Sequence, residues 1–140
     1  MSSAATVLFP WSDEYNVNIG IIDTQHKNLV NIINELHKAM IAGKAKQDLG
    51  SSLARLVNYT RVHFNTEETI MESHQYPDFP SHKSLHEQLT KTVLDFQAKF
   101  QKGEIGLTIE VMDFLKGWLG KHILGTDKRY TEFLNSKGVR

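Results

Sequence analysis

Apolar residues recur along much of the chain at alternating spacings of three and four, as expected for helices that bury one face in a bundle. The first such face starts near residue 19 and reads Ile22, His26, Leu29, Ile33, Leu36 and Met40. The second runs from about Lys46 to His74 and reads Leu53, Leu56, Thr60, His63, Glu67 and Ile70. The sequence therefore predicts two long helices, the first of which ends at Gly43.

Two further helices are predicted after a proline-containing segment. Pro77 and Pro80 interrupt helical hydrogen bonding, so residues 76–80 are expected to form a loop, with Ser81 as the cap of the third helix. The inward face of that helix reads His82, His86, Leu89, Val93, Phe96 and Phe100. The fourth helix is expected to start at Thr108, with an inner face of Val111, Leu115, Trp118 and His122. Gly125 should end it, placing Asp127 in the following turn, and residues 128–135 should form a short terminal helix.

Short connections between four helices force neighbours to run antiparallel, so the predicted fold is all-α, an up-down-up-down four-helix bundle. Residues 1–18 precede it as an irregular arm, in which Pro10 lacks a backbone donor and Trp11 is large enough to anchor the arm. We expect one domain over residues 1–140, with the arm at 1–18, the bundle at about 19–127 and a C-terminal tail at 128–140.

Histidine or acidic residues occupy positions on all four helical faces where apolar residues are expected. A spacing of four returns to nearly the same helical face, so His63 and Glu67 point the same way, and His82 and His86 repeat this arrangement. The starts of the first and third helices and the ends of the second and fourth lie at one end of such a bundle. We therefore expect that end to gather seven candidate ligands: His26, His63, Glu67, His82, His86, His122 and Asp127. The opposite end of the core is expected to be apolar.

Composition excludes several kinds of site. Lys plus Arg and Asp plus Glu each number 16, without a basic stripe, which argues against nucleic-acid binding. The chain has no cysteine, so a metal must be held by nitrogen and oxygen ligands. The N-terminal segment MSSAATVLFPW lacks a basic stretch followed by a long apolar run, and no later stretch approaches the roughly 18 apolar residues that cross a bilayer. We expect a cytoplasmic protein without membrane insertion.

The number of candidate ligands favours two metal ions. Five histidines and two carboxylates exceed the four ligands of a tetrahedral zinc site. They suit two octahedral ions, one with three histidines and one with two, bridged by the carboxylates and leaving one open position. Nitrogen and oxygen donors favour iron among redox metals, although zinc, cobalt or manganese can occupy such a site.

Other metal chemistries fit the spacing less well. The segment HKSLH lacks the glutamate that follows the first histidine in helical zinc proteases. Carboxylate-rich di-iron bundles use Glu and His at a spacing of three, whereas the spacing here is four and histidine dominates. Haem needs only two axial ligands, which leaves the other histidines unexplained.

The chain resembles the hemerythrin family, in particular its single-domain bacterial members. The resemblance rests on Trp11 in the arm, IIDTQHKNL from Ile21, HFNTEE from His63, HKSLH, and WLGKHILGTD from Trp118 to Asp127. It implies two non-haem irons with an oxo or hydroxo bridge. The implied ligands are His82, His86 and His122 on one iron, His26 and His63 on the other, and bridging Glu67 and Asp127. The implied oxygen pocket is apolar and consists of Leu29, Phe64, Trp118, Leu119 and Ile123.

The resemblance also implies a function, reversible dioxygen binding at the iron held by His26 and His63. The protein would be a monomer and not an enzyme, and it would store or transport oxygen or deliver it to an oxygen-consuming enzyme. Two alternatives remain at this point. One is a di-iron enzyme, such as a peroxidase or a nitric-oxide-handling protein, and the other is a sensor of oxygen or iron.

Overall fold

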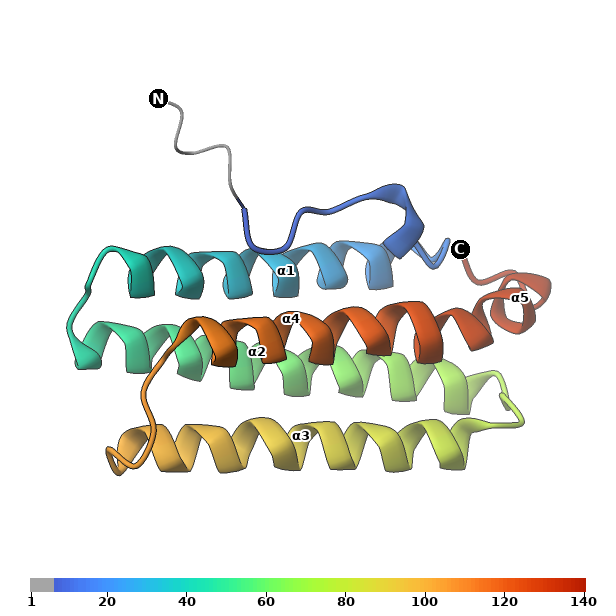
Figure 1. Cartoon of the computed structure of the whole chain (residues 1–140). Helices are drawn as coiled ribbons and strands as arrows, with labels where there is room; N and C mark the ends of the chain where they lie inside the picture. The colour runs from blue at the N-terminus through green and yellow to red at the C-terminus, as the bar shows by residue number, and fades with distance from the viewer. Residues whose placement is uncertain (1–6) are drawn as a thin grey trace.

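The computed structural model describes residues 7–140, and the four predicted long helices are present in it (Figure 1). Their bounds are α1 at Gly20–Ile41, α2 at Lys46–Ser73, α3 at Phe79–Gln101 and α4 at Ile109–Lys121. A π-helical segment, η3 at His122–Asp127, links α4 to the terminal helix α5 at Lys128–Ser136, and a 3-10 turn, η2, covers Asp13–Tyr15. The all-α prediction is confirmed, since the described residues contain no strand.

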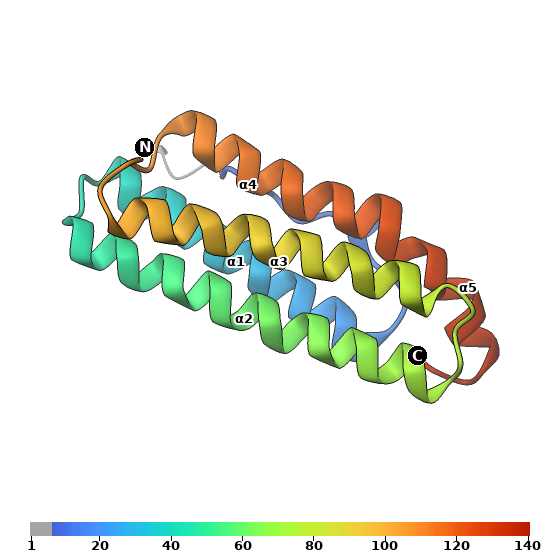
Figure 2. The same cartoon turned by 90° about the horizontal axis from the view of Figure 1, so that it is seen from below.

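The long helices lie side by side with alternating directions, as both views show (Figures 1 and 2). The start of α1, the end of α2, the start of α3 and the end of α4 meet at the end of the bundle where α5 lies (Figure 1). This is the end at which the candidate ligands were predicted to converge. Buried aliphatic and aromatic side chains from all of these helices form one core along the bundle.

Most of the predicted helix boundaries are confirmed, and one predicted cap is wrong. Gly43 and Gly103 follow α1 and α3 with φ of 69° and 79°, a region that glycine enters without steric cost. The hydroxyl of Thr108 accepts a hydrogen bond from the amide of Val111 at 3.3 Å and so caps α4. Ser81, however, lies inside α3, because the helix begins at Phe79 with Pro80 in its first turn. A backbone N–H in the first turn of a helix has no partner within the helix, so the N–H that proline lacks is not needed there. Pro80 is therefore compatible with a helix that begins at Phe79.

The prediction that Gly125 ends the fourth helix is also wrong. The helical backbone continues from α4 through η3 into α5, and Gly125 lies within the π-helical segment. In that segment the hydrogen bonds run from residue i to residue i+5, so each turn holds more residues than an α-helical turn. Asp127 therefore belongs to a continuous helix and not to a loop.

The arm crosses the outside of the bundle and is fixed to α1. Asn34 pairs with the backbone of Phe9 through two hydrogen bonds of 2.9 and 3.0 Å, and Phe9 is buried. Farther along, the carboxylate of Asp23 accepts a 2.7 Å hydrogen bond from the amide of Val17. The part of the arm predicted for residues 1–6 lies outside the described residues. Among residues 7–140, no helix has the length and apolar character needed to span a membrane.

Candidate metal centre

Seven buried side chains at one end of the bundle form two overlapping groups of ligand atoms. The first group consists of Glu67, His82, His86, His122 and Asp127, and the second of His26, His63, Glu67 and Asp127. Within each group the ligand atoms lie within 4.8 Å of one another. Both carboxylates belong to both groups, so the arrangement has two centres that share Glu67 and Asp127.

The two shared carboxylates are presented differently. Asp127 directs Oδ2 at Nε2 of His26 (2.9 Å) and Oδ1 at Nε2 of His122 (2.9 Å) and of His82 (3.1 Å). Glu67 instead turns Oε1 toward Nε2 of His63 (3.1 Å), of His86 (3.3 Å) and of His122 (3.8 Å). One oxygen of Asp127 therefore faces each group, whereas a single oxygen of Glu67 faces both.

The π-helical segment brings the last two ligand residues together. On an α-helix, residues five apart are separated by about 140° around the axis, so His122 and Asp127 would face different directions. In a π-helical turn the residue at i+5 returns below residue i. His122 and Asp127 consequently both enter the core, although they come from one continuous helix.

The donor atoms fit a positively charged metal better than they fit one another. Buried atoms without a hydrogen-bond partner include Nε2 of all five histidines, Oε1 of Glu67 and both carboxylate oxygens of Asp127. These atoms approach one another closely but without hydrogen-bond geometry. Each unpartnered buried polar atom costs on the order of 1–3 kcal/mol, so a cluster of this size is unfavourable without a common partner. Metal cations bridging nitrogen and carboxylate oxygen satisfy all of them at once.

The charges of the cluster are strongly perturbed when no metal is bound. Burial favours the neutral ring of His122, but Asp127 and then Glu67 outweigh it and raise the pKa of His122 to about 10. Burial and Glu67 oppose ionisation of Asp127, yet contact with His122 and His26 holds the pKa of Asp127 below its ordinary value. For His63, burial lowers the pKa more than Glu67 raises it. A metal that binds at His122 must therefore displace a proton from that ring.

Three residues outside the predicted set hold the ligand side chains in place. Nδ1 of His63 is hydrogen-bonded to Oε1 of Gln25 at 2.8 Å, and Nδ1 of His86 lies 2.8 Å from Oε2 of Glu68. The hydroxyl of Tyr130 donates a hydrogen bond to Oε2 of Glu67. Such contacts orient the rings so that Nε2 points into the centre. The sequence places Gln25 and Glu68 directly beside ligand residues, but nothing marks Tyr130, whose direction depends on the π-helical segment.

The five residues of the predicted oxygen pocket are all buried. Leu29, Leu119 and Ile123 are almost completely inaccessible, and Phe64 and Trp118 are less than one-tenth exposed. The ring of Phe64 stacks on His86 with 3.9 Å between ring centres, whereas the corresponding distance to His63 is 5.9 Å. Phe64 is thus closer to the three-histidine group than to the two-histidine group. The remaining histidines of the chain, His37 and His74, belong to neither group, and Nδ1 of His74 bonds to the carbonyl of Ile70 at its own helix end.

A four-helix bundle with two centres built from histidine and shared carboxylates defines a class of metal-binding protein, and comparison with known sequences identifies the family. The hemerythrin HHE cation binding domain matches residues 17–134. The chain is 35% identical to a bacteriohemerythrin of Methylococcus capsulatus over 130 residues, which cover 92% of this chain and 98% of the relative. It is 39% identical to a bacteriohemerythrin of Pseudomonas aeruginosa over 126 residues, covering 87% and 78% of the two chains. The chain belongs to the hemerythrin family.

A solved structure supports the same assignment at the level of the fold. The crystal structure of a wild-type hemerythrin superimposes with a TM-score of 0.85 at 35% sequence identity, covering 91% of this chain and 98% of the other. The family resemblance proposed from the sequence motifs is therefore confirmed, as is the four-helix bundle.

Proposed function

We propose that this chain binds dioxygen reversibly at a non-haem di-iron centre and serves to store oxygen, transport it or deliver it to an oxygen-consuming enzyme. The observation that carries the proposal is the unequal pair of ligand groups, with three histidines on one side, two on the other and two shared carboxylates. An ion in the two-histidine group has fewer protein ligands than its neighbour. It is therefore the ion with room for an added ligand.

The ligand assignment follows the two groups. His82, His86 and His122 would hold one iron, His26 and His63 the other, and Glu67 and Asp127 would bridge them. When bound, the iron pair supplies two electrons to dioxygen and takes them back on release. The protein contributes neutral, oriented imidazole rings, for which Gln25 and Glu68 provide the hydrogen bonds.

The apolar surroundings support binding over catalysis. Leu29, Leu119 and Ile123 bring no ionisable group to the site and exclude water from it. Tyr130 is committed to Glu67, and burial together with the nearby carboxylates raises its pKa well above the usual range, so it is a poor proton donor. We accordingly propose an oxygen-binding protein that is not an enzyme. We further propose that it acts in the cytoplasm as a monomer.

The decisive experiment measures iron per chain and the optical spectrum of the reduced protein under argon, in oxygen and under argon again. We expect two irons per chain and a peroxide-to-iron charge-transfer band that forms with oxygen and disappears when oxygen is removed. If the oxidised spectrum returns to the reduced one only after electrons are added, the protein is an enzyme or a redox sensor instead. Absence of iron would contradict the proposal altogether.

The contribution of the buried apolar side chains of the predicted oxygen pocket can be tested with Leu119→Ala, because Leu119 is buried and carries no ligand atom. The variant should retain its iron while the reduced protein oxidises irreversibly in air several-fold faster, since the smaller side chain admits water. The rate is followed by the loss of the reversible spectral change. Equal rates in the variant and the parent would remove Leu119 from the oxygen pocket.

A further inference from the structure

A chain of hydrogen bonds connects the backbone of α2 to His63 of the metal centre. The hydroxyl of Thr66 donates to the carbonyl of Val62 at 3.0 Å, one turn earlier on the same helix. The side-chain amide of Gln25, on α1, donates to the same hydroxyl through Nε2 at 3.2 Å. Oε1 of Gln25 in turn lies 2.8 Å from Nδ1 of His63. Successive hydrogen bonds therefore join a backbone carbonyl to a candidate metal ligand.

Each hydrogen bond in this chain can run in only one direction. A carbonyl oxygen can only accept, so the single hydroxyl hydrogen of Thr66 is committed to Val62, and toward Gln25 the hydroxyl can only accept. The NH2 group of Gln25 must then face Thr66, which leaves its oxygen facing His63. That oxygen also can only accept, so Nδ1 of His63 carries the hydrogen. A neutral imidazole has one N–H, so Nε2 keeps the free lone pair that a metal requires.

The opposite tautomer of His63 has a partner inside the metal centre. Nε2 of His63 lies 3.1 Å from Oε1 of Glu67, so a hydrogen on Nε2 would give this carboxylate oxygen a donor. Turning the amide of Gln25 over would support that form, because its NH2 group would then donate to Nδ1. A ring that carries its hydrogen on Nε2 cannot bind a metal through that atom. The hydroxyl of Thr66 opposes this change, because it accepts from the NH2 group only in the observed orientation.

The other ligand histidines are held differently. Glu68 presents a carboxylate to Nδ1 of His86 at 2.8 Å, and a carboxylate accepts without further support. Nδ1 of His26, the second histidine of the two-histidine group, is buried without a hydrogen-bond partner. Of the two histidines in that group, His63 is therefore the one whose tautomer is fixed by another side chain.

We propose that Thr66 is a positioning residue for the two-histidine group: acting through Gln25, it fixes the tautomer of His63 and thereby raises the affinity of this group for its metal ion. The proposal rests on the proposed function, since it takes this group to hold a metal ion. It concerns the protein ligands alone, however, and can be tested without iron or oxygen.

Thr66→Val tests the proposal, because valine has a similar shape but lacks the hydroxyl. In the metal-free full chain, nitrogen NMR of the histidine rings shows which ring nitrogen carries the hydrogen. We expect the hydrogen of His63 on Nδ1 in the parent and a substantial share of it on Nε2 in Thr66→Val. In zinc titration calorimetry, one of two binding events should be weakened by up to about tenfold in the variant, and the other should be unchanged.

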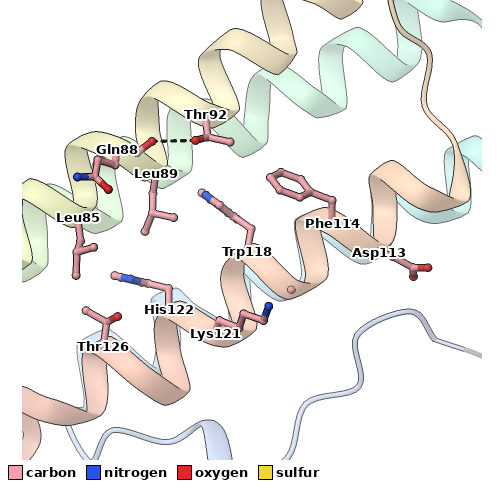
Figure 3. A pocket seen from close by; sticks show the side chains of 11 residues that line it. Leu85, Gln88, Leu89, Thr92, Asp113, Phe114, Trp118, Lys121, His122 and Thr126 are labelled. Atoms are coloured by element: carbon pink, nitrogen blue, oxygen red, sulfur yellow. Dashed lines mark hydrogen bonds between the residues drawn. The ribbon is translucent and has the colours of Figure 1, made fainter.

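Three further variants separate this role from a merely structural one. Thr66→Ser keeps the hydroxyl and should behave like the parent. Thr92→Val is the matched control, because Thr92 donates to the carbonyl of Gln88 at 3.0 Å in the same way, but on α3 (Figure 3). Gln25→Leu breaks the chain of hydrogen bonds by itself. Adding Thr66→Val to Gln25→Leu should therefore weaken zinc binding no further, whereas an independent structural effect of Thr66 would add to the loss.

Several outcomes would overturn the role of Thr66. These are a hydrogen on Nε2 of His63 in the parent, the same tautomer in the parent and in Thr66→Val, equal losses of zinc affinity in Thr66→Val and Thr92→Val, and additive losses in the double variant. The proposed function would fail in a different way. The parent would then bind two zinc ions and show the expected tautomer of His63, but its iron form would not bind oxygen reversibly.

Discussion

The two ends of the bundle use the same helical spacing for different purposes. At the end away from α5, the inward positions hold only apolar side chains, among them Leu36, Leu53, Phe100 and Met112, all of them buried. At the other end, the corresponding rows hold His26, His63, Glu67, His82, His86 and His122. The first end gains free energy from burial itself. The second contains buried polar atoms without hydrogen-bond partners, which a cation would satisfy.

This difference implies that stability and metal binding are partly separable within one domain. Side chains at the apolar end should determine the stability of the metal-free chain, whereas those at the metal end should determine how much stability a metal adds. Because a metal binds the folded state preferentially, its contribution appears as added stability. Substitutions at the two ends should therefore give different combinations of metal content and stability.

The largest effect is expected for His122→Ala. This change removes a candidate ligand atom and the shorter of the two histidine contacts of Oδ1 of Asp127, the one at 2.9 Å; His82 at 3.1 Å remains. Iron per chain should fall well below that of the parent, and the melting temperature measured with iron should drop toward that of the metal-free protein. His37→Ala, which removes a histidine outside both ligand groups, is the control and should retain its iron. An unchanged iron content in His122→Ala would exclude this residue from the centre.

Leu36→Ala tests the apolar end with a change of similar severity. Leu36 is completely buried, and truncation of such a leucine typically costs 2–5 kcal/mol of unfolding free energy. We expect a loss in this range by urea unfolding, together with an unchanged number of metal ions per chain. Loss of metal in Leu36→Ala would show that the two ends are coupled and would contradict their separation.

The pH dependence of the metal-free protein should distinguish the two ends without any substitution. The folded-state pKa of His122 is raised to about 10, above its ordinary value of 6.5. The protonated ring therefore stabilises the fold fully below about pH 6.5, and this contribution is lost as the pH rises toward 10. Calorimetry should show a falling melting temperature over this interval, and Leu36→Ala should show the same slope. A metal-free His122→Ala variant should lose the slope, and a slope that persists in it would assign the effect to another group.

A smaller effect is expected from exchanging the hydrogen-bond partners within the metal end. Glu68→Gln removes a negative charge from His86, and Gln25→Glu places one beside His63. Because an anionic partner makes an imidazole a stronger donor to a metal, Glu68→Gln should weaken cobalt binding at the three-histidine group by up to about tenfold. Gln25→Glu should strengthen binding at the two-histidine group. Cobalt titrations followed by optical absorption test both, and changes in the same direction would show that charge is not the cause.

Sequence reasoning predicted the fold and the end of the bundle at which the candidate ligands lie, because both depend on regular helical periodicity. The rows that contain His26, His63 and His86 follow the spacing of three and four, and the antiparallel topology brings those rows to one end. Thr108 was likewise predictable as a cap, because its hydroxyl acts within a single turn. Ser81 was misassigned, because a proline in the first turn of a helix gives the same sequence signal as one in a loop.

What could not be predicted depends on departures from α-helical geometry and on contacts between helices. Nothing in the segment from His122 to Asp127 specifies a π-helical turn, and Gly125 resembles a helix end there. The partners Gln25 and Tyr130 lie on different helices from the residues that they contact, His63 and Glu67. Their roles follow from the packing of α1, α2 and α5, which a single sequence does not determine.

The π-helical segment also fixes the phase of everything that follows it. An extra residue in an unchanged α-helix would rotate everything after it by about 100°, whereas the wider turn from His122 to Asp127 takes up that residue and continues into α5 without a break. It directs Tyr130 toward Glu67. Deleting a single residue between His122 and Asp127 would bring the pair to a spacing of four, which an ordinary α-helical turn also places on one face. Inserting a further residue there would change no ligand, yet it would turn both Asp127 and Tyr130 away from the core. In this protein the length of one helical turn, as much as the identity of any side chain, specifies the metal centre.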